Sequence, residues 1–139
     1  METVYADITL KNLYDRMSYE HGYSKDPEVR QITVRARVDT DVMTLVINEA
    51  IWQKLGLNSR YPCTATLAKG IRAKCEKTDA VEMHWKDRSS VLDAVIADVD
   101  DVILGRLPLM DMDLIADPVS HELVGAHGDK PMHFDYTIL

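Results

Sequence analysis

The chain has 139 residues, enough for one domain with a buried core. Its net charge of -7 at pH 7 argues against a nucleic-acid partner, because phosphate binding draws on clustered Lys and Arg. No apolar stretch is long enough to span a bilayer, and METVYADITLKN lacks the basic-then-apolar pattern of a signal peptide. We therefore expect a single domain over residues 1–139, located in the cytoplasm, with neither a membrane nor a nucleic-acid partner.

The first third of the sequence predicts two strands separated by a short helix. Residues 4–10 form a short β-branched and apolar run, and residues 29–38 alternate apolar and polar side chains with the period of a half-buried strand. Between them, Asn12 is placed to cap a helix that begins at Leu13 and ends near Gly22. The second strand leads directly into Asp39.

The middle third predicts a strand, a helix and a hairpin. Residues 44–47 are a short apolar run, and Asn48 then caps a helix that ends at Gly56. Residues 64–68 and 71–75 flank Lys69 and Gly70, which indicates a hairpin with a two- or three-residue turn. The shorter turn places Thr64 opposite Cys75, and the longer turn places Cys63 there.

Cys63 and Cys75 are the two cysteines of the chain. Two cysteines do not make a disulfide framework, and no second pair of ligands joins them into a zinc site. We therefore predict two thiols in a reducing compartment, although the longer hairpin turn would make a disulfide conceivable.

The last third predicts short strands with little between them. The expected strands are residues 78–85, 90–96, 102–104, 114–116, 122–124 and 132–138, with one helical turn over 107–112. A polar turn at 86–89 joins the first two of these strands, and Gly105 ends the third. Many short strands with one clear helix predict a mostly β protein with a small, closed barrel-like domain.

Asp39 is the main candidate for chemistry. It ends a strand, follows the apolar Val38 and precedes Thr40 and another buried strand. Apolar surroundings disfavour the charged form of a carboxylate, so Asp39 needs hydrogen bonds or a partner that shares a proton. On its own, however, a strand-ending Asp is more often a turn former than a catalyst.

The surroundings of Asp39 resemble the retropepsin-like aspartic protease family. The chain carries, in order, VDT, TLVI, a capped helix ending in KLGL, a hairpin with glycine at its tip, VILGRLPL and DLIADP. The resemblance runs from about Ile32 to about Val124. Its most specific parts are the Asp-Thr turn and the later segment of two apolar residues and a glycine, Ile103, Leu104 and Gly105.

This resemblance implies a homodimeric aspartic endopeptidase with one Asp39 from each subunit. Thr40 would reach the backbone of the partner, Leu104 and Gly105 would lie behind the Asp turn, and residues 134–138 would help to pair the subunits. A flap over an extended peptide would consist of Ala68, Lys69, Gly70 and Ile71. The mechanism needs only water, so the resemblance implies no metal and no cofactor.

The sequence departs from the family pattern at Asp41, where the family has glycine. Asp41 adds bulk and negative charge, so four acidic groups would crowd the site of a dimer. Met43 replaces an acid that pairs with the arginine after the later glycine in several members, and we hypothesise that Arg106 turns toward Asp41 instead. Two functions therefore remain open: a peptidase, weakened or tolerant at Asp41, or a silent dimer that binds peptides or serves as a structural module.

Overall fold

The computed structural model describes residues 3–58, 60–66 and 70–132. Its strands are β1 Val4–Asn12, β2 Gln31–Val38, β3 Leu45–Ile47, β4 Arg60–Thr66, β5 Arg72–Trp85, β6 Arg88–Ile96, β7 Ile103–Leu104, β8 Leu114–Asp117 and β9 Glu122–Gly125. Its helices are α1 Leu13–Glu20, α2 Glu49–Lys54 and α3 Arg106–Asp111. The expected strand over 132–138 and the hairpin residues Ala68 and Lys69 lie largely or wholly outside the described residues.

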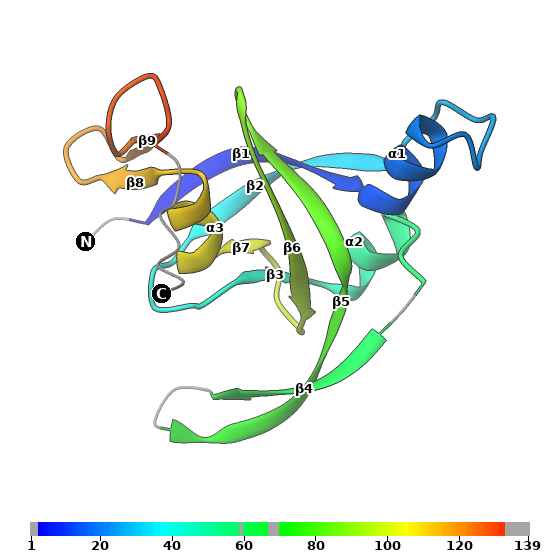
Figure 1. Cartoon of the computed structure of the whole chain (residues 1–139). Helices are drawn as coiled ribbons and strands as arrows, with labels where there is room; N and C mark the ends of the chain where they lie inside the picture. Colours follow the sequence, from blue (N-terminus) through cyan, green and yellow to red (C-terminus); the bar gives the residue numbers. More distant parts are fainter. Residues whose placement is uncertain (1–2, 59, 67–69, 133–139) are drawn as a thin grey trace, which may run out of the picture.

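Six strands close into a barrel in the order β1-β2-β7-β3-β6-β5, because β5 pairs back onto β1. Strand β4 pairs with the far side of β5, and β8 and β9 form a separate two-stranded sheet (Figure 1). The mostly β, closed-barrel prediction is confirmed. The three short helices of the described residues lie where the sequence predicted two capped helices and one helical turn. No helix in this part of the chain is long and apolar enough to cross a membrane.

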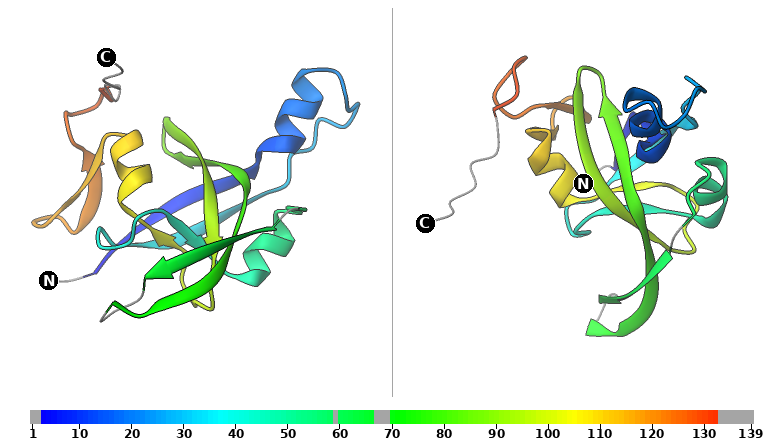
Figure 2. Two further views of the ribbon diagram at one scale, coloured as in Figure 1. Left: turned by 60° about the horizontal axis from the view of Figure 1, so that its bottom comes forward. Right: turned by 45° about the vertical axis from the view of Figure 1, so that its right-hand side comes forward.

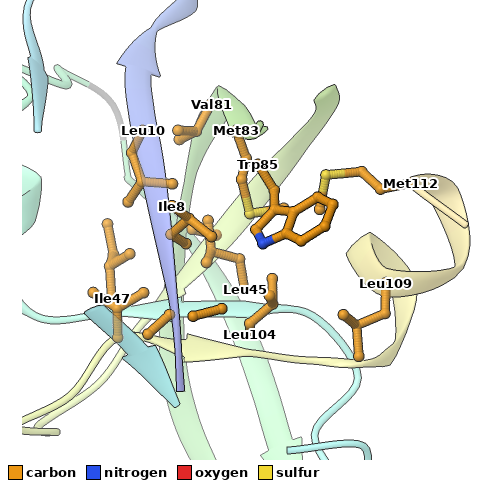
Figure 3. Close-up of a cluster of buried hydrophobic side chains, with 14 of the residues drawn as sticks. Ile8, Leu10, Leu45, Ile47, Val81, Met83, Trp85, Leu104, Leu109 and Met112 are labelled. Atoms are coloured by element: carbon orange, nitrogen blue, oxygen red, sulfur yellow. The ribbon is translucent and has the colours of Figure 1, made fainter. Parts of the chain in front are cut away.

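The barrel is filled by side chains that alternate inward along each strand. The residues in the centre of the cluster are Ile8, Leu10, Leu45, Ile47, Val81, Met83 and Leu104, all almost fully buried (Figure 3). Trp85, Leu109 and Met112 extend this cluster toward α3. Because burying such a side chain contributes about 1.5 to 3 kcal/mol, this core holds the strands next to Asp39 in place.

Helix α1 sits at the turn of the β1–β2 hairpin and is tied to the barrel by polar contacts. The Asn12 side chain accepts a hydrogen bond from the Asp15 N–H, which confirms the predicted cap. Arg16 Nε donates to Glu82 Oε2 on β5 at 2.7 Å. Glu82 also contacts His84 Nε2 at 2.6 Å. These contacts hold α1 at the end of the barrel where β1 ends at Asn12.

Strand β5 is one continuous strand of 14 residues, not the two separate strands that the sequence suggested. Its first half pairs with β4, and its second half belongs to the barrel. The register with β6 shifts between Lys77 and Ala80, where the buried Thr78 Oγ1 accepts a hydrogen bond from the Ala94 N–H at 3.0 Å. Such a bulge bends the strand, so β4 and the first half of β5 leave the barrel as an arm.

Cys63 lies directly opposite Cys75 in the β4–β5 ladder, which is the register expected for the longer hairpin turn. The two residues form a disulfide, with 5.0 Å between their Cα atoms. The prediction of two free thiols was therefore wrong. The sequence left two registers open, and only one of them brings the two sulfur atoms together.

Candidate active site

The Asp39 turn spans residues 39–44 and connects two strands that do not pair with each other. Strand β7 inserts between them, parallel to β2 and antiparallel to β3. The turn must therefore cross two strand spacings, about 10 Å in all. It is tied to β7 by hydrogen bonds, from the Asp39 N–H to the Leu104 carbonyl at 3.0 Å and from the Arg106 N–H to the Val42 carbonyl at 2.8 Å.

Gly105 allows this close packing. A Cβ at that position would overlap the Thr44 carbonyl oxygen and would lie 2.6 Å from the Val42 carbonyl oxygen. Both neighbours are backbone atoms of the Asp39 turn, so they cannot rotate away as a flexible side chain would. The glycine that follows Ile103 and Leu104 is thus required by its close contact with the backbone of the turn.

The Asp39 carboxylate is half-buried and receives a donor on each oxygen. Oδ1 accepts a hydrogen bond from the Asp41 N–H at 3.0 Å, and Oδ2 accepts one from Arg37 Nη1 at 3.1 Å. These donors orient the carboxylate and balance its charge. Sequence reasoning overlooked Arg37, although residues two apart on a strand point to the same side.

Arg106 does not pair with Asp41, so that hypothesis was wrong. Its Nη1 donates to the Thr40 carbonyl oxygen at 3.3 Å, and among the described residues it forms no ion pair with Asp41. Arg37 is thus the cation that pairs with a carboxylate of the turn, and Arg106 binds the backbone of the turn.

Thr40 and Asp41 are both exposed at the tip of the turn. Asp41 is not among the described residues with a positive φ angle, so the backbone at position 41 does not require glycine. Asp41 therefore introduces no backbone strain that would destabilise the fold. Any effect of Asp41 on chemistry has to come from its bulk or its charge.

The expected flap lies only partly within the described residues. Of the four, the structure describes Gly70 and Ile71, and both are exposed. No hydrogen bond or ion pair within the described residues joins either of them to the turn. The arm that carries them runs beneath the barrel, below the loop that follows β2 (Figures 1 and 2).

Apolar side chains are exposed beside the turn. Met43 is 60% exposed and Leu107 is 48% exposed, and the Leu107 N–H donates to the Met43 carbonyl oxygen at 2.8 Å. Next to them lies a cavity of about 280 Å³ between β6 and α3, lined in part by Thr44, Val91 and Met110. Exposed apolar surface of this kind suits contact with a peptide or with another protein surface.

Comparisons with known proteins find similarity among solved structures. No protein-family model matches the sequence, and no curated protein matches it either. Among solved structures, the chain is similar to the EIAV protease complexed with the inhibitor HBY-793, at 25% sequence identity and a TM-score of 0.49. The similarity covers 57% of this chain and 76% of that chain.

Proposed function

We propose that this chain is one subunit of a homodimeric, retropepsin-like aspartic endopeptidase in which Asp39 is the catalytic residue. The observation that carries the proposal is the packing of Gly105 beneath the Asp39 turn. Carbonyl and N–H groups of β7 and its flanks fix the turn, so the carboxylate stands at a rigid backbone position. The order of VDT and VILGRLPL along the chain, which carries the family resemblance, gives the same assignment.

The proposed chemistry needs two copies of the turn. Two Asp39 carboxylates about 3 Å apart cannot both ionise comfortably, so the pair shares one proton and titrates in two steps. The ionised carboxylate takes a proton from a bound water, and the protonated one donates to the peptide carbonyl. Thr40 would tie each turn to the backbone of the other subunit. A single chain supplies one Asp39 and is expected to be inert.

The remaining site residues are assigned to substrate and support. Ala68, Lys69, Gly70 and Ile71 would close over an extended peptide, and the exposed Met43 and Leu107 would contact its side chains. Leu104, Gly105 and Arg106 would hold the turn from behind. The substrate is proposed as a peptide or protein segment, hydrolysed without a metal or a cofactor.

A second candidate, a silent dimer of the same fold, is favoured by two observations at the turn. Arg37 occupies Oδ2 of Asp39, and Asp41 places an acidic side chain where the family has glycine. Both features would lower activity without disturbing the fold. The silent dimer would bind peptide segments or act as a structural module.

Peptide cleavage followed by mass spectrometry separates the two candidates. The purified chain would be incubated with a diverse peptide pool between about pH 4 and pH 7, the range in which a carboxylate pair titrates. Asp39→Asn would be run beside it, with Asp87→Asn as the matched control, because Asp87 is an exposed acid in the β5–β6 turn.

Cleavage that is lost in Asp39→Asn and kept in Asp87→Asn would support the peptidase. If no variant cleaves, Asp41→Gly becomes the deciding variant. Activity gained on that substitution would identify Asp41 as the residue that silences the site. Continued inactivity would favour the binding or structural role.

A further inference from the structure

The β4–β5 arm, defined here as Arg60–Thr66 and residues 72–77, joins the barrel at its base, where Glu76 and Lys77 pair with Ile96 and Val95 of β6. Strand β4 is the last strand of its sheet and pairs with β5 alone. The arm begins where the bulge at Thr78 bends β5 out of the barrel, and it extends away from the other strands in Figure 1 and in the right view of Figure 2. Beyond its base, the arm is therefore kept ordered by contacts between β4 and β5 themselves.

Side-chain contacts fasten the base of the arm. The Arg60 guanidinium stacks over the Trp52 ring of α2, 3.9 Å from its centroid, and pairs with Glu49 and Glu76. Tyr61 Oη donates to Asp79 Oδ1 at 2.9 Å. These contacts bind the arm to α2 and to the bend in β5.

The Cys63–Cys75 disulfide is the next tie along the arm. Beyond it, described residues 64–66 and 70–74 form no side-chain hydrogen bond and no ion pair, so backbone pairing alone joins the strands there. Both cysteines are only half-buried, so a thiol reagent can reach them. The disulfide thus lies between the base of the arm, which side-chain contacts hold in place, and the end of the arm, where only backbone hydrogen bonds join β4 and β5.

We propose that Cys63 and Cys75 form a reversible redox site that controls the order of the β4–β5 arm. In reduction, a thiolate of a dithiol reductant attacks one sulfur, breaks the S–S bond and forms a mixed disulfide. The second thiol of the reductant then displaces the remaining cysteine. The protein gains two electrons and two protons as two thiols, and the reductant leaves as a cyclic disulfide. In the return step a disulfide oxidant such as oxidised glutathione takes up the two electrons and two protons as two thiols, and the Cys63–Cys75 bond forms again.

The location expected from the sequence bears on this assignment. Disulfides in cytoplasmic proteins are uncommon, and those that occur are usually transient, catalytic or redox-sensing. A cytoplasmic chain with this cysteine pair would therefore alternate between two states of the arm. In the oxidised state the strands stay paired toward residues 66 and 70, and in the reduced state that end opens more often.

A consequence for the Asp39 site rests on the proposed function. If the arm is the flap of the peptidase, a peptide can bind only when the arm is ordered over it. Reduction adds an ordering cost to binding, so KM for peptide cleavage rises while kcat stays nearly constant. We expect KM to rise about fivefold on reduction.

Hydrogen exchange measured by mass spectrometry tests the redox site without any need for activity. The oxidised full-length chain would be compared with the same protein after dithiothreitol, and intact mass would count the thiols through a gain of about 2 Da per disulfide. We expect exchange across residues 63–66 and 72–75 to become about tenfold faster on reduction. Exchange in β1 and β2 should not change.

Two variants complete the experiment. Cys63→Ser with Cys75→Ser should exchange rapidly in the arm and ignore dithiothreitol. Thr64→Ala with Lys74→Ala alters the neighbouring cross-strand pair and should keep the full response to dithiothreitol. Arm exchange that does not change on reduction, or cysteines that stay reduced after treatment with oxidised glutathione, would overturn the proposal. If exchange in the arm depends on the redox state but the chain cleaves no peptide, the redox site is supported. That result would contradict only the proposed peptidase function.

Discussion

The Asp39 turn and the β4–β5 arm are both expected to contact a substrate, yet they are held in opposite ways. The turn is locked by backbone hydrogen bonds to β7 and by the close approach of Gly105. The arm is an edge hairpin held by β5, a few base contacts and one disulfide. The group proposed for chemistry thus lies on a rigidly held backbone, whereas the element proposed as the flap is weakly held.

The strongest test of this difference substitutes one glycine in each region. Gly105→Ala would force a Cβ into the backbone of the Asp39 turn, and we expect it to lower the free energy of unfolding by about 3 kcal/mol. Gly70→Ala is the matched change at the arm. Nothing lies within 4 Å of its new Cβ, so only the positive φ of 74° opposes it, at about 1 kcal/mol.

Urea unfolding of both glycine variants gives these free energies. If Gly105→Ala lowers the free energy of unfolding no more than Gly70→Ala does, the turn is not locked by β7. The Asp39 turn would then be no more rigidly held than the arm.

The next test compares two glutamates on the two halves of β5. The Glu82 side chain is 8% exposed and the Glu76 side chain is 51% exposed, although each pairs with an arginine. Burial acts to raise the pKa of Glu82, but hydrogen bonds from His84 and Arg16 outweigh it and hold that pKa below its ordinary value. We expect Glu82→Gln to cost about 2 kcal/mol at neutral pH, and Glu76→Gln about 0.3 kcal/mol.

The pH dependence of the Glu82→Gln effect follows from the lowered pKa. A depressed carboxyl pKa stabilises the fold above the ordinary value of 4.5, and this contribution is lost as the pH falls through the lower folded-state value. Thermal unfolding at several pH values should therefore show the two proteins converging below pH 4.5. A difference that persists unchanged in acid would assign the effect to packing rather than to charge.

The smallest expected effect concerns Arg37 beside the Asp39 carboxylate. Removing it in Arg37→Leu frees Oδ2 of Asp39 to face the second carboxylate, so peptide cleavage should increase by about fivefold at most, the equivalent of one exposed ion pair. Arg35→Leu is the control, since Arg35 lies on the same strand but stacks over Tyr5 instead. A loss of kcat in Arg37→Leu alone would show that Arg37 supports the reaction.

Sequence patterns predicted the capped helices and the strand before Asp39, because the signals for these elements come from residues close together in the sequence. Asn12 and Asn48 cap α1 and α2 as expected, and the period-2 run into Asp39 is strand β2. The continuity of β5 escaped prediction, because the bulge near Thr78 breaks the alternation that marks a single strand.

Contacts that depend on register or on distant segments were harder to predict. The Cys63–Cys75 disulfide depends on the length of the hairpin turn, and the sequence was compatible with either of two turn lengths. The hydrogen bond from Arg106 to the Thr40 carbonyl needs the three-dimensional course of the turn beside β7. Position 41 shows the same limit, since its φ angle, not its residue type, decides whether glycine is required.

The central claim is that two Asp39 turns meet to form one site. A crystal structure of the purified chain tests it through the distance between the Asp39 carboxylates of neighbouring subunits, whether or not the protein cleaves peptides. The account predicts a two-fold dimer with these carboxylates about 3 Å apart. A dimer that leaves the two Asp39 side chains on separate surfaces, or a chain that crystallises as a monomer, would contradict it.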